Sequence, residues 1–359
     1  MENRPSQKPS IGSVRRRAAT TEIQSLIKTS FLPQGSPLPI IVEPSLPEVD
    51  LISWAEQSRD FIAEHLLRCG GLLFRGFRLE DASSVSTFEQ FAQTLAQGAL
   101  LDYTYRSTPR DKVAGNVFTS TEYPRDQEIP LHNEMSYARS WPLKIWFHSL
   151  EVAEQGGETP LADSRKVYAR LDPALIERFE QKKVMYVRNY GSGLDLPWQN
   201  VFQTEKQSEV EEYCRSTGID YEWLGGDRLR TTQVCQVTVK HPQTGEKVWF
   251  NQAHLFHVQS LPARVREALL AQHKEEELPR HALYGDGTPI EAETIAQIKQ
   301  VYDEESIVFP WQKGDILLLD NMLVAHGRRS FVGARKVVVA MAESFTASQE
   351  LNETRSKQG

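Results

Sequence analysis

A series of short stretches rich in β-branched and aromatic residues limits the folds that this chain can adopt. Turn-forming residues, such as Gly156-Gly157 and Lys313-Gly314-Asp315, separate these stretches. Many short strands with frequent turns are typical of a β-barrel or a β-sandwich. The sequence therefore predicts a mainly β core. The stretches lie at 116–121, 144–152, 182–191, 233–242, 246–252, 315–321 and 336–341.

Helical patterns flank and interrupt the β-rich region. Apolar residues at helical spacing predict a helix over 51–68 that ends at Gly70-Gly71, and a second helix over 84–98. A short buried strand is expected between them, at 72–77. The predicted fold class is α+β, with helices packed outside the β core. Further helices are expected near 164–182, 206–217 and 262–276.

Length and composition favour one domain, over residues 21–350, between a flexible basic leader at 1–20 and a polar tail at 351–359. The net charge of −7 argues against a nucleic-acid partner, because nucleic-acid-binding proteins present a basic surface. No apolar run reaches the length of a membrane span, which is about 18 residues, and the N-terminus lacks the apolar core of a secretory signal. We therefore expect no membrane partner and a cytoplasmic location. The oligomeric state is left open.

A His-x-Glu motif is the first candidate site. His132 and Glu134 are two residues apart, so in an extended segment their side chains project to the same side. With one more histidine they would form the 2-His-1-carboxylate triad of non-haem iron(II) oxygenases. His326, just after the apolar stretch 316–319, is the best candidate for the third ligand. Because an isolated His-x-Glu is more often a surface pair than a metal site, this prediction depends on its surroundings.

Two further motifs could bind a carboxylate. Thr159 follows the glycine pair Gly156-Gly157, and its hydroxyl could donate a hydrogen bond there, although a plain hairpin turn is the alternative. Arg335 enters an apolar strand nine residues beyond His326. A buried guanidinium needs a partner, which a bidentate carboxylate would supply. A charge at the edge of a strand is the alternative, and the neighbouring Lys336 could take the same role.

Taken together and in this order, the motifs resemble the TauD/TfdA-like dioxygenases, in the branch with a His-x-Glu motif that includes SyrP-like and clavaminate-synthase-like enzymes. The resemblance covers roughly residues 70–345 and rests on several segments at once. The segments are GGLLFRGF, STEYPRDQEIPLHNEMSY, GGETPLADSR, WFNQAHLFH and DNMLVAHGRRSFVGARKVVVAM.

This resemblance implies a double-stranded β-helix, that is, a jelly-roll of the cupin type, with helices outside. It implies that His132, Glu134 and His326 bind Fe²⁺, and that Thr159 and Arg335 bind the co-substrate 2-oxoglutarate. Dioxygen would then oxidise an unactivated C–H bond. Taurine-type members carry His-x-Asp, and related halogenases replace the carboxylate with a small residue. Glu134 keeps a carboxylate, so we expect hydroxylation and not halogenation.

The expected substrate is a small amino-acid-like metabolite in natural-product biosynthesis. One alternative is the same chemistry on an aminoacyl group tethered to a carrier protein. Two others are a zinc hydrolase on a cupin-like barrel and a metal-binding barrel without oxygenase activity. The net negative charge of the chain does not favour docking to an acidic carrier protein, which favours a free substrate.

Overall fold

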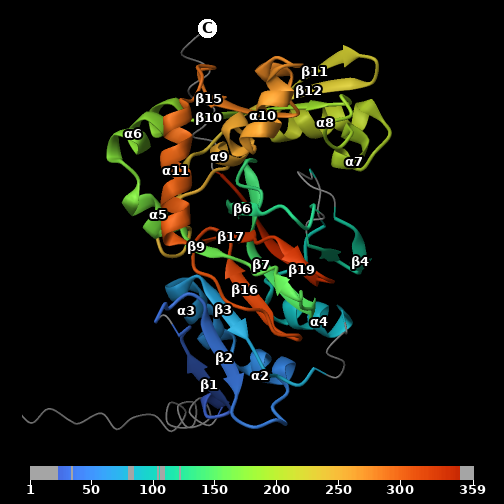
Figure 1. Ribbon diagram of the computed structural model, residues 1–359. Coiled ribbons are helices and arrows are strands. Elements are labelled where there is room, and N and C mark those ends of the chain that lie inside the picture. The colour runs from blue at the N-terminus through green and yellow to red at the C-terminus, as the bar shows by residue number, and fades with distance from the viewer. Residues whose placement is uncertain are drawn as a thin grey trace, which may run out of the picture.

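The computed structural model describes residues 23–33, 35–79, 85–102, 105, 110–120 and 123–347. The predicted leader at 1–20 and tail at 351–359 lie outside these residues. An eight-stranded sheet forms the centre, in the order β1-β2-β3-β16-β7-β19-β5-β4 (Figure 1). Its strands are β1 (Ile27–Ser30), β2 (Ile40–Pro44), β3 (Gly71–Phe74), β4 (Lys112–Ala114), β5 (Val117–Thr119), β7 (Ser140–Glu151), β16 (Ile316–Asp320) and β19 (Lys336–Thr346).

A smaller sheet, in the order β6-β17-β9, forms the second wall of the jelly-roll. A pair of two-residue strands, β8 and β18, lies at its margin. Leu161 of β9 and Val324 of β17 share one apolar cluster with Phe147 and Leu317 of the eight-stranded sheet, so this cluster is the core between the two walls. The strands are β6 (Ile129–His132), β9 (Leu161–Asp163), β17 (Val324–Arg328), β8 (Gln155–Gly156) and β18 (Phe331–Val332).

The eight-stranded sheet is buried on both faces, which explains the unbroken apolar runs of its central strands. In β16, Leu317 and Leu319 enter the core between the walls. Ile316 and Leu318 point to the other face, where they share a cluster with Phe88 of α4. Successive side chains of a strand alternate between faces, so a strand covered on both sides needs apolar residues throughout. The helices that cover this outer face are α2 (Leu51–Gln57), α3 (Arg59–Cys69) and α4 (Val85–Leu95).

The helix predicted over 51–68 is two helices, because the chain breaks at Ser58. Gly70 ends α3, as predicted, with a left-handed φ of 80°. Glycine is needed there for a second reason: a Cβ at position 70 would lie 2.4 Å from Cγ2 of Val324. The helix end therefore packs directly on β17.

Residues 164–306, here called the excursion, leave the jelly-roll after β9 and return before β16 (Figure 1). They build a four-stranded sheet, in the order β11-β12-β10-β15, over an apolar cluster that also includes Leu131, Ala162 and Ala325 of the jelly-roll strands. Leu161 and Ile307 close the excursion at its base through two backbone hydrogen bonds of 2.8 Å. The strands of this sheet are β10 (Val184–Tyr190), β11 (Asp220–Gly225), β12 (Arg228–Cys235) and β15 (Arg280–Tyr284). A separate pair is formed by β13 (Thr238–Lys240) and β14 (Lys247–Trp249).

Most helices of the excursion follow the sequence prediction. The helices are α5 (Ser164–Arg170), α6 (Pro173–Lys182), α7 (Trp198–Phe202), α8 (Gln207–Thr217), α9 (Ala253–Phe256), α10 (Ala263–Leu270) and α11 (Ala292–Glu305), with 3-10 turns η1 (Val258–Ser260) and η2 (Glu275–Glu277). The sequence prediction missed α7, α9 and α11. In α11, the buried Ile295, Ile298 and Tyr302 recur at helical spacing. Among the described residues, no helix has both the length and the apolar character required to cross a bilayer.

Candidate metal centre

Strand pairing brings the two predicted histidine ligands together. His132 is the last residue of β6, and His326 lies in the middle of β17. The two residues are direct partners in the antiparallel ladder. Paired residues project their side chains to the same face of a sheet, so the imidazoles meet, with ring centroids 4.7 Å apart. Residues far apart in the sequence thus form one site because of sheet register.

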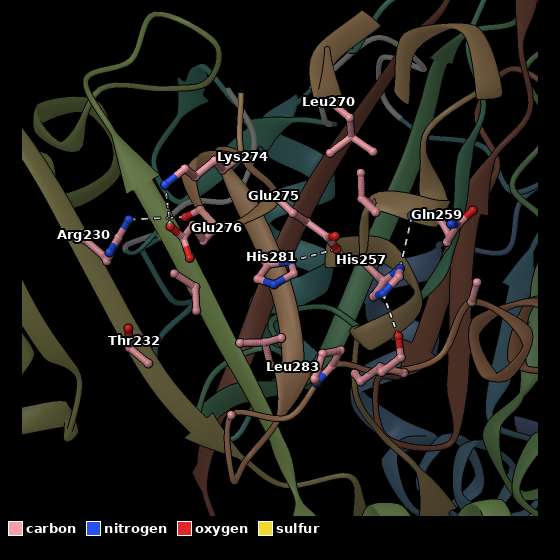
Figure 2. A pocket seen from close by; sticks show the side chains of 16 residues that line it. Arg230, Thr232, His257, Gln259, Leu270, Lys274, Glu275, Glu276, His281 and Leu283 are labelled. Carbon is pink, nitrogen blue, oxygen red and sulfur yellow. Dashed lines mark hydrogen bonds and ion pairs between the residues drawn. The ribbon is translucent and has the colours of Figure 1, made fainter. Parts of the chain in front are cut away.

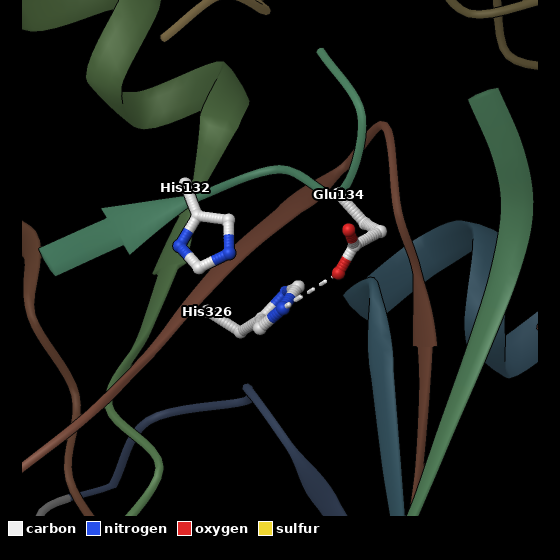
Figure 3. A group of neighbouring side chains, drawn as sticks. All are labelled: His132, Glu134 and His326. Atoms are coloured by element: carbon white, nitrogen blue, oxygen red, sulfur yellow. Dashed lines mark ion pairs between the residues drawn. The ribbon is translucent and has the colours of Figure 1, made fainter. Parts of the chain in front are cut away.

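Glu134 completes a group of three, as Figure 3 shows. One potential ligand atom from each of His132, Glu134 and His326 lies within 4.8 Å of the others, and this is the one such group among the residues that the structure describes. Oε2 of Glu134 is 4.0 Å from Nε2 of His326, too far for a hydrogen bond. Two imidazoles and one carboxylate that converge without bonding each other match the donor set of a non-haem iron site.

Both imidazoles are suited to metal binding. Nδ1 of His132 lies 2.8 Å from the carbonyl oxygen of Pro130, so Nδ1 carries the proton and Nε2 keeps its lone pair. His326 is buried, and its Nδ1 has no hydrogen-bond partner among the described residues. Burial lowers the pKa of both histidines and so favours their neutral forms. A cation held by the three side chains would use the lone pairs that the protein leaves unbonded.

Arg110 is part of this centre, and the sequence analysis missed it. Its Nη2 donates a hydrogen bond of 2.6 Å to Oε2 of Glu134. Both side chains are only 3% exposed, so the ion pair is shielded from water. Arg110 precedes β4 and belongs to none of the recognised motifs, so no local pattern pointed to it.

Three polar side chains hold the backbone around Glu134 in place. Asn321 accepts a hydrogen bond from the amide of Glu134 at 2.7 Å and donates one to its carbonyl at 2.9 Å. Gln252 donates to the carbonyl of Asn133 at 2.8 Å. Nε2 of His254 lies 2.9 Å from the carbonyl of Leu131, to which it donates. The motif WFNQAHLFH therefore supports the segment that carries His132 and Glu134.

The predicted co-substrate residues lie on two adjoining segments. Gly156 and Gly157 have left-handed φ values of 69° and 75°, and a Cβ on Gly156 would lie 2.1 Å from the carbonyl oxygen of Ser330. The two glycines thus let β8 pair closely with β18. Nε of Arg335 donates a hydrogen bond of 2.8 Å to the carbonyl of Gly157, two residues before Thr159. The glycine turn therefore links the segments of Arg335 and Thr159.

Thr159 has its hydroxyl proton available for a ligand. Its side chain is buried, and Oγ1 accepts a hydrogen bond of 3.0 Å from the indole of Trp311. A hydroxyl that already accepts can still donate, because it carries one proton and two lone pairs. The indole therefore favours a donor role for Thr159 toward an incoming carboxylate.

Arg335 has the features of an anion-binding residue. No ion pair of Arg335 occurs among the residues that the structure describes, and burial lowers the pKa of its guanidinium to about 10. A half-buried cation of this kind gains most from a carboxylate partner. Of the neighbouring cations, Lys336 is exposed and Arg329 pairs with Glu128 at 3.0 Å, so Arg335 remains the first candidate.

A comparison with known families identifies the chain. Residues 34–341 match the family described as "Taurine catabolism dioxygenase TauD, TfdA family". The chain belongs to the TauD/TfdA dioxygenase family. The match spans both walls of the jelly-roll and the excursion, and it confirms the resemblance recognised from the motifs. It also confirms the expected enzyme class, a non-haem iron dioxygenase that uses 2-oxoglutarate.

Two relatives and one solved structure are similar to this TauD/TfdA chain over most of its length. It is 44% identical over 293 residues to a dapdiamide synthesis protein, DdaC, of Enterobacter agglomerans, which covers 81% of this chain and 87% of the relative. It is 29% identical over 329 residues to a clavaminate synthase-like protein of Arabidopsis thaliana, which covers 86% and 95%. The crystal structure of PvcB from Pseudomonas aeruginosa has the same fold, with a TM-score of 0.52, 14% identity and coverage of 88% and 90%.

The TauD/TfdA chain has a further cavity, away from the metal centre, of about 660 Å³ on the excursion (Figure 2). His257 and His281 line it, but neither belongs to a group of three potential ligands in the described part of the chain. His257 donates to the carbonyl of Ile290, and His281 faces Glu275 at 3.5 Å. The converging donors of the metal centre make it the better candidate for catalysis.

Proposed function

We propose that His132, Glu134 and His326 hold Fe²⁺ and that Thr159 and Arg335 hold 2-oxoglutarate. The observation that carries the proposal is the convergence of three donors within 4.8 Å on paired strands of a jelly-roll. Iron with 2-oxoglutarate supplies the oxidation of an unactivated C–H bond by dioxygen, while 2-oxoglutarate becomes succinate and carbon dioxide. The protein contributes position, charge and exclusion of water.

Each residue has one part in this arrangement. His132, Glu134 and His326 offer one donor each, which leaves open positions on a six-coordinate ion. Arg335 offers a cation to the distal carboxylate of 2-oxoglutarate, and the hydroxyl of Thr159 offers a hydrogen bond. Burial of Glu134, His326 and Thr159 keeps water away from the reacting atoms.

Glu134 supports hydroxylation as the reaction. A halogenase needs room for a halide where this chain places a carboxylate. The two curated relatives carry names that refer to dapdiamide synthesis and clavaminate synthase. These names support a small amino-acid-like substrate in natural-product biosynthesis. The proposed substrate is the free metabolite, and an aminoacyl group tethered to a carrier protein is the alternative.

The proposal is tested by turnover of 2-oxoglutarate. We expect succinate formation that depends on Fe²⁺ and dioxygen, and no turnover in His132→Ala or Glu134→Ala. His273→Ala, a histidine after α10 and outside the group of three, is the matched control and should keep wild-type turnover. Wild-type turnover and Mn²⁺ affinity in His132→Ala would show that the metal lies elsewhere.

The substrate class is tested on the same protein. Free amino acids and aminoacyl carrier-protein thioesters are added separately, and the products are analysed by mass spectrometry. Hydroxylation adds one oxygen atom to the substrate, with one succinate formed per product. Oxidation of the carrier-bound group alone would overturn the free-substrate proposal, and a chlorinated product in the presence of chloride would overturn hydroxylation.

A further inference from the structure

The ion pair between Arg110 and Glu134 places a positive charge beside a proposed metal ligand. A guanidinium beside a metal ligand repels the incoming cation, because two positive charges a few ångströms apart interact strongly in a shielded site. Burying both side chains also costs several kcal/mol, which their attraction offsets only when the geometry is good. The pair is short and almost fully buried, at 2.6 Å with 3% exposure of each side chain. Its place in the centre therefore needs an explanation other than stability.

The backbone of Glu134 is fixed, and its side chain is the part that could move. Asn321 bonds both the amide and the carbonyl of Glu134, so the Cα cannot shift easily. A glutamate has one more rotatable bond than the aspartate at the same position of taurine-type enzymes. The extra bond lets the carboxylate swing and rotate, unless another group holds it.

Arg110 holds the carboxylate of Glu134. Its hydrogen bond is made to Oε2, the oxygen that also faces Nε2 of His326 at 4.0 Å. An oxygen held by a guanidinium can still offer its second lone pair to a cation. For both oxygens to chelate one ion, the carboxylate must turn, and the bond to Arg110 opposes this turn.

We propose that Arg110 is a positioning residue that makes Glu134 bind the metal through one oxygen. This inference rests on the proposed function, because it takes His132, Glu134 and His326 as the ligands. Three single-donor side chains leave three of six positions open, enough for a bidentate 2-oxo acid and dioxygen. A bidentate Glu134 would leave two positions, so either 2-oxoglutarate or dioxygen would lose its place.

The test compares Arg110→Met and Arg110→Lys with the wild type, without turnover. Mn²⁺ binding is measured by calorimetry, and the water ligands on bound Mn²⁺ are measured by water-proton relaxation. The binding of 2-oxoglutarate to the Mn²⁺-loaded proteins is then measured anaerobically. Arg280→Met removes another guanidinium–carboxylate pair, with Asp195 at 2.8 Å in the excursion, and is the matched control.

In Arg110→Met we expect Mn²⁺ to bind at least as tightly as in the wild type, because a positive charge is gone and both carboxylate oxygens can chelate. The water-relaxation signal should fall by about one water ligand, and the affinity for 2-oxoglutarate should fall at least tenfold. Arg110→Lys should restore much of the water-relaxation signal and of the affinity for 2-oxoglutarate, because the ammonium also bonds the carboxylate. Arg280→Met should match the wild type in all three measurements.

Three results would overturn the inference. Unchanged water relaxation with weaker 2-oxoglutarate binding would show that Arg110 acts only through its charge. A tenfold loss of Mn²⁺ affinity in Arg110→Met would show that it supports metal binding itself. Unchanged 2-oxoglutarate affinity in Arg110→Met would show that Arg110 is not needed to position the Glu134 carboxylate. Failure of the proposed function looks different, since the wild type would then bind no Mn²⁺, or His132→Ala would bind it as tightly.

Discussion

Substitution of Gly157 by alanine should weaken 2-oxoglutarate binding more than it weakens the fold. A Cβ at this position would lie 2.9 Å from Cδ and 3.1 Å from Nε of Arg335, and 3.1 Å from Cβ of Ala153. The arginine side chain can yield more easily than the backbone, so it should move and lose its hydrogen bond to the Gly157 carbonyl. The left-handed φ of 75° adds a strain of about 1–2 kcal/mol for alanine.

The magnitude follows from the group that is displaced. A hydrogen bond to a charged group contributes about 1.5–3 kcal/mol, so a misplaced Arg335 should raise the KM for 2-oxoglutarate by about 10- to 150-fold. Gly225 has the same φ of 75° and no atom within 4 Å of its hypothetical Cβ, so Gly225→Ala separates strain from collision. Both variants should lose similar stability in urea unfolding, and only Gly157→Ala should show the higher KM. If the two KM values agree within twofold, Arg335 does not bind 2-oxoglutarate in the way proposed.

Three further results are expected. Trp311→Phe removes the hydrogen bond to Thr159 and should raise the KM for 2-oxoglutarate about 3- to 10-fold, with little further change when Thr159→Ala is added. Asn321→Asp places an unpaired charge against the carbonyls of Glu134 and Pro142, and should lower the free energy of unfolding by about 3–5 kcal/mol. Asn116→Asp is the control and should lower it less, because Asn116 is half-buried and its amide nitrogen donates to one carbonyl, that of Leu100. Burial lowers the pKa of His254 to about 4, so the unfolded chain binds its proton first as the pH falls from about 6.5 to 4. The stability from this neutral histidine is complete above pH 6.5 and should be lost below it, by up to about 3 kcal/mol in urea unfolding, and His254→Gln should lack this part of the slope.

The strands and the three converging side chains could be predicted because their signals are local. Apolar runs mark β16 and β19, and the spacing of His132 and Glu134 is a property of one extended segment. His326 is the predicted third donor because of its place after an apolar strand, and the family resemblance supports this prediction. Strand register itself could not be predicted, because it is set by contacts between distant segments. The structure supplies that register directly, with His132 opposite His326.

The parts that were not predicted depend on contacts between segments without a shared pattern. Arg110, Asn321 and Trp311 act through partners that are distant in the sequence, at Glu134 and Thr159. Nothing in the residues around each one distinguishes it from an ordinary arginine, asparagine or tryptophan. α11 is different, since its helical spacing was present in the sequence and was overlooked.

The attachments of the excursion to the jelly-roll have a consequence for how such an enzyme can diversify. Leu161 and Ile307 close its base, and Gln252 and His254 brace the strand that carries His132. Between these fixed points, the four-stranded sheet of the excursion contributes none of the three converging donors. Loops and strands there can change in length and sequence while the oxidising centre keeps its geometry. Evolution, or a designer, can thus rewrite the excursion between its base and its brace without rebuilding the group of three donors.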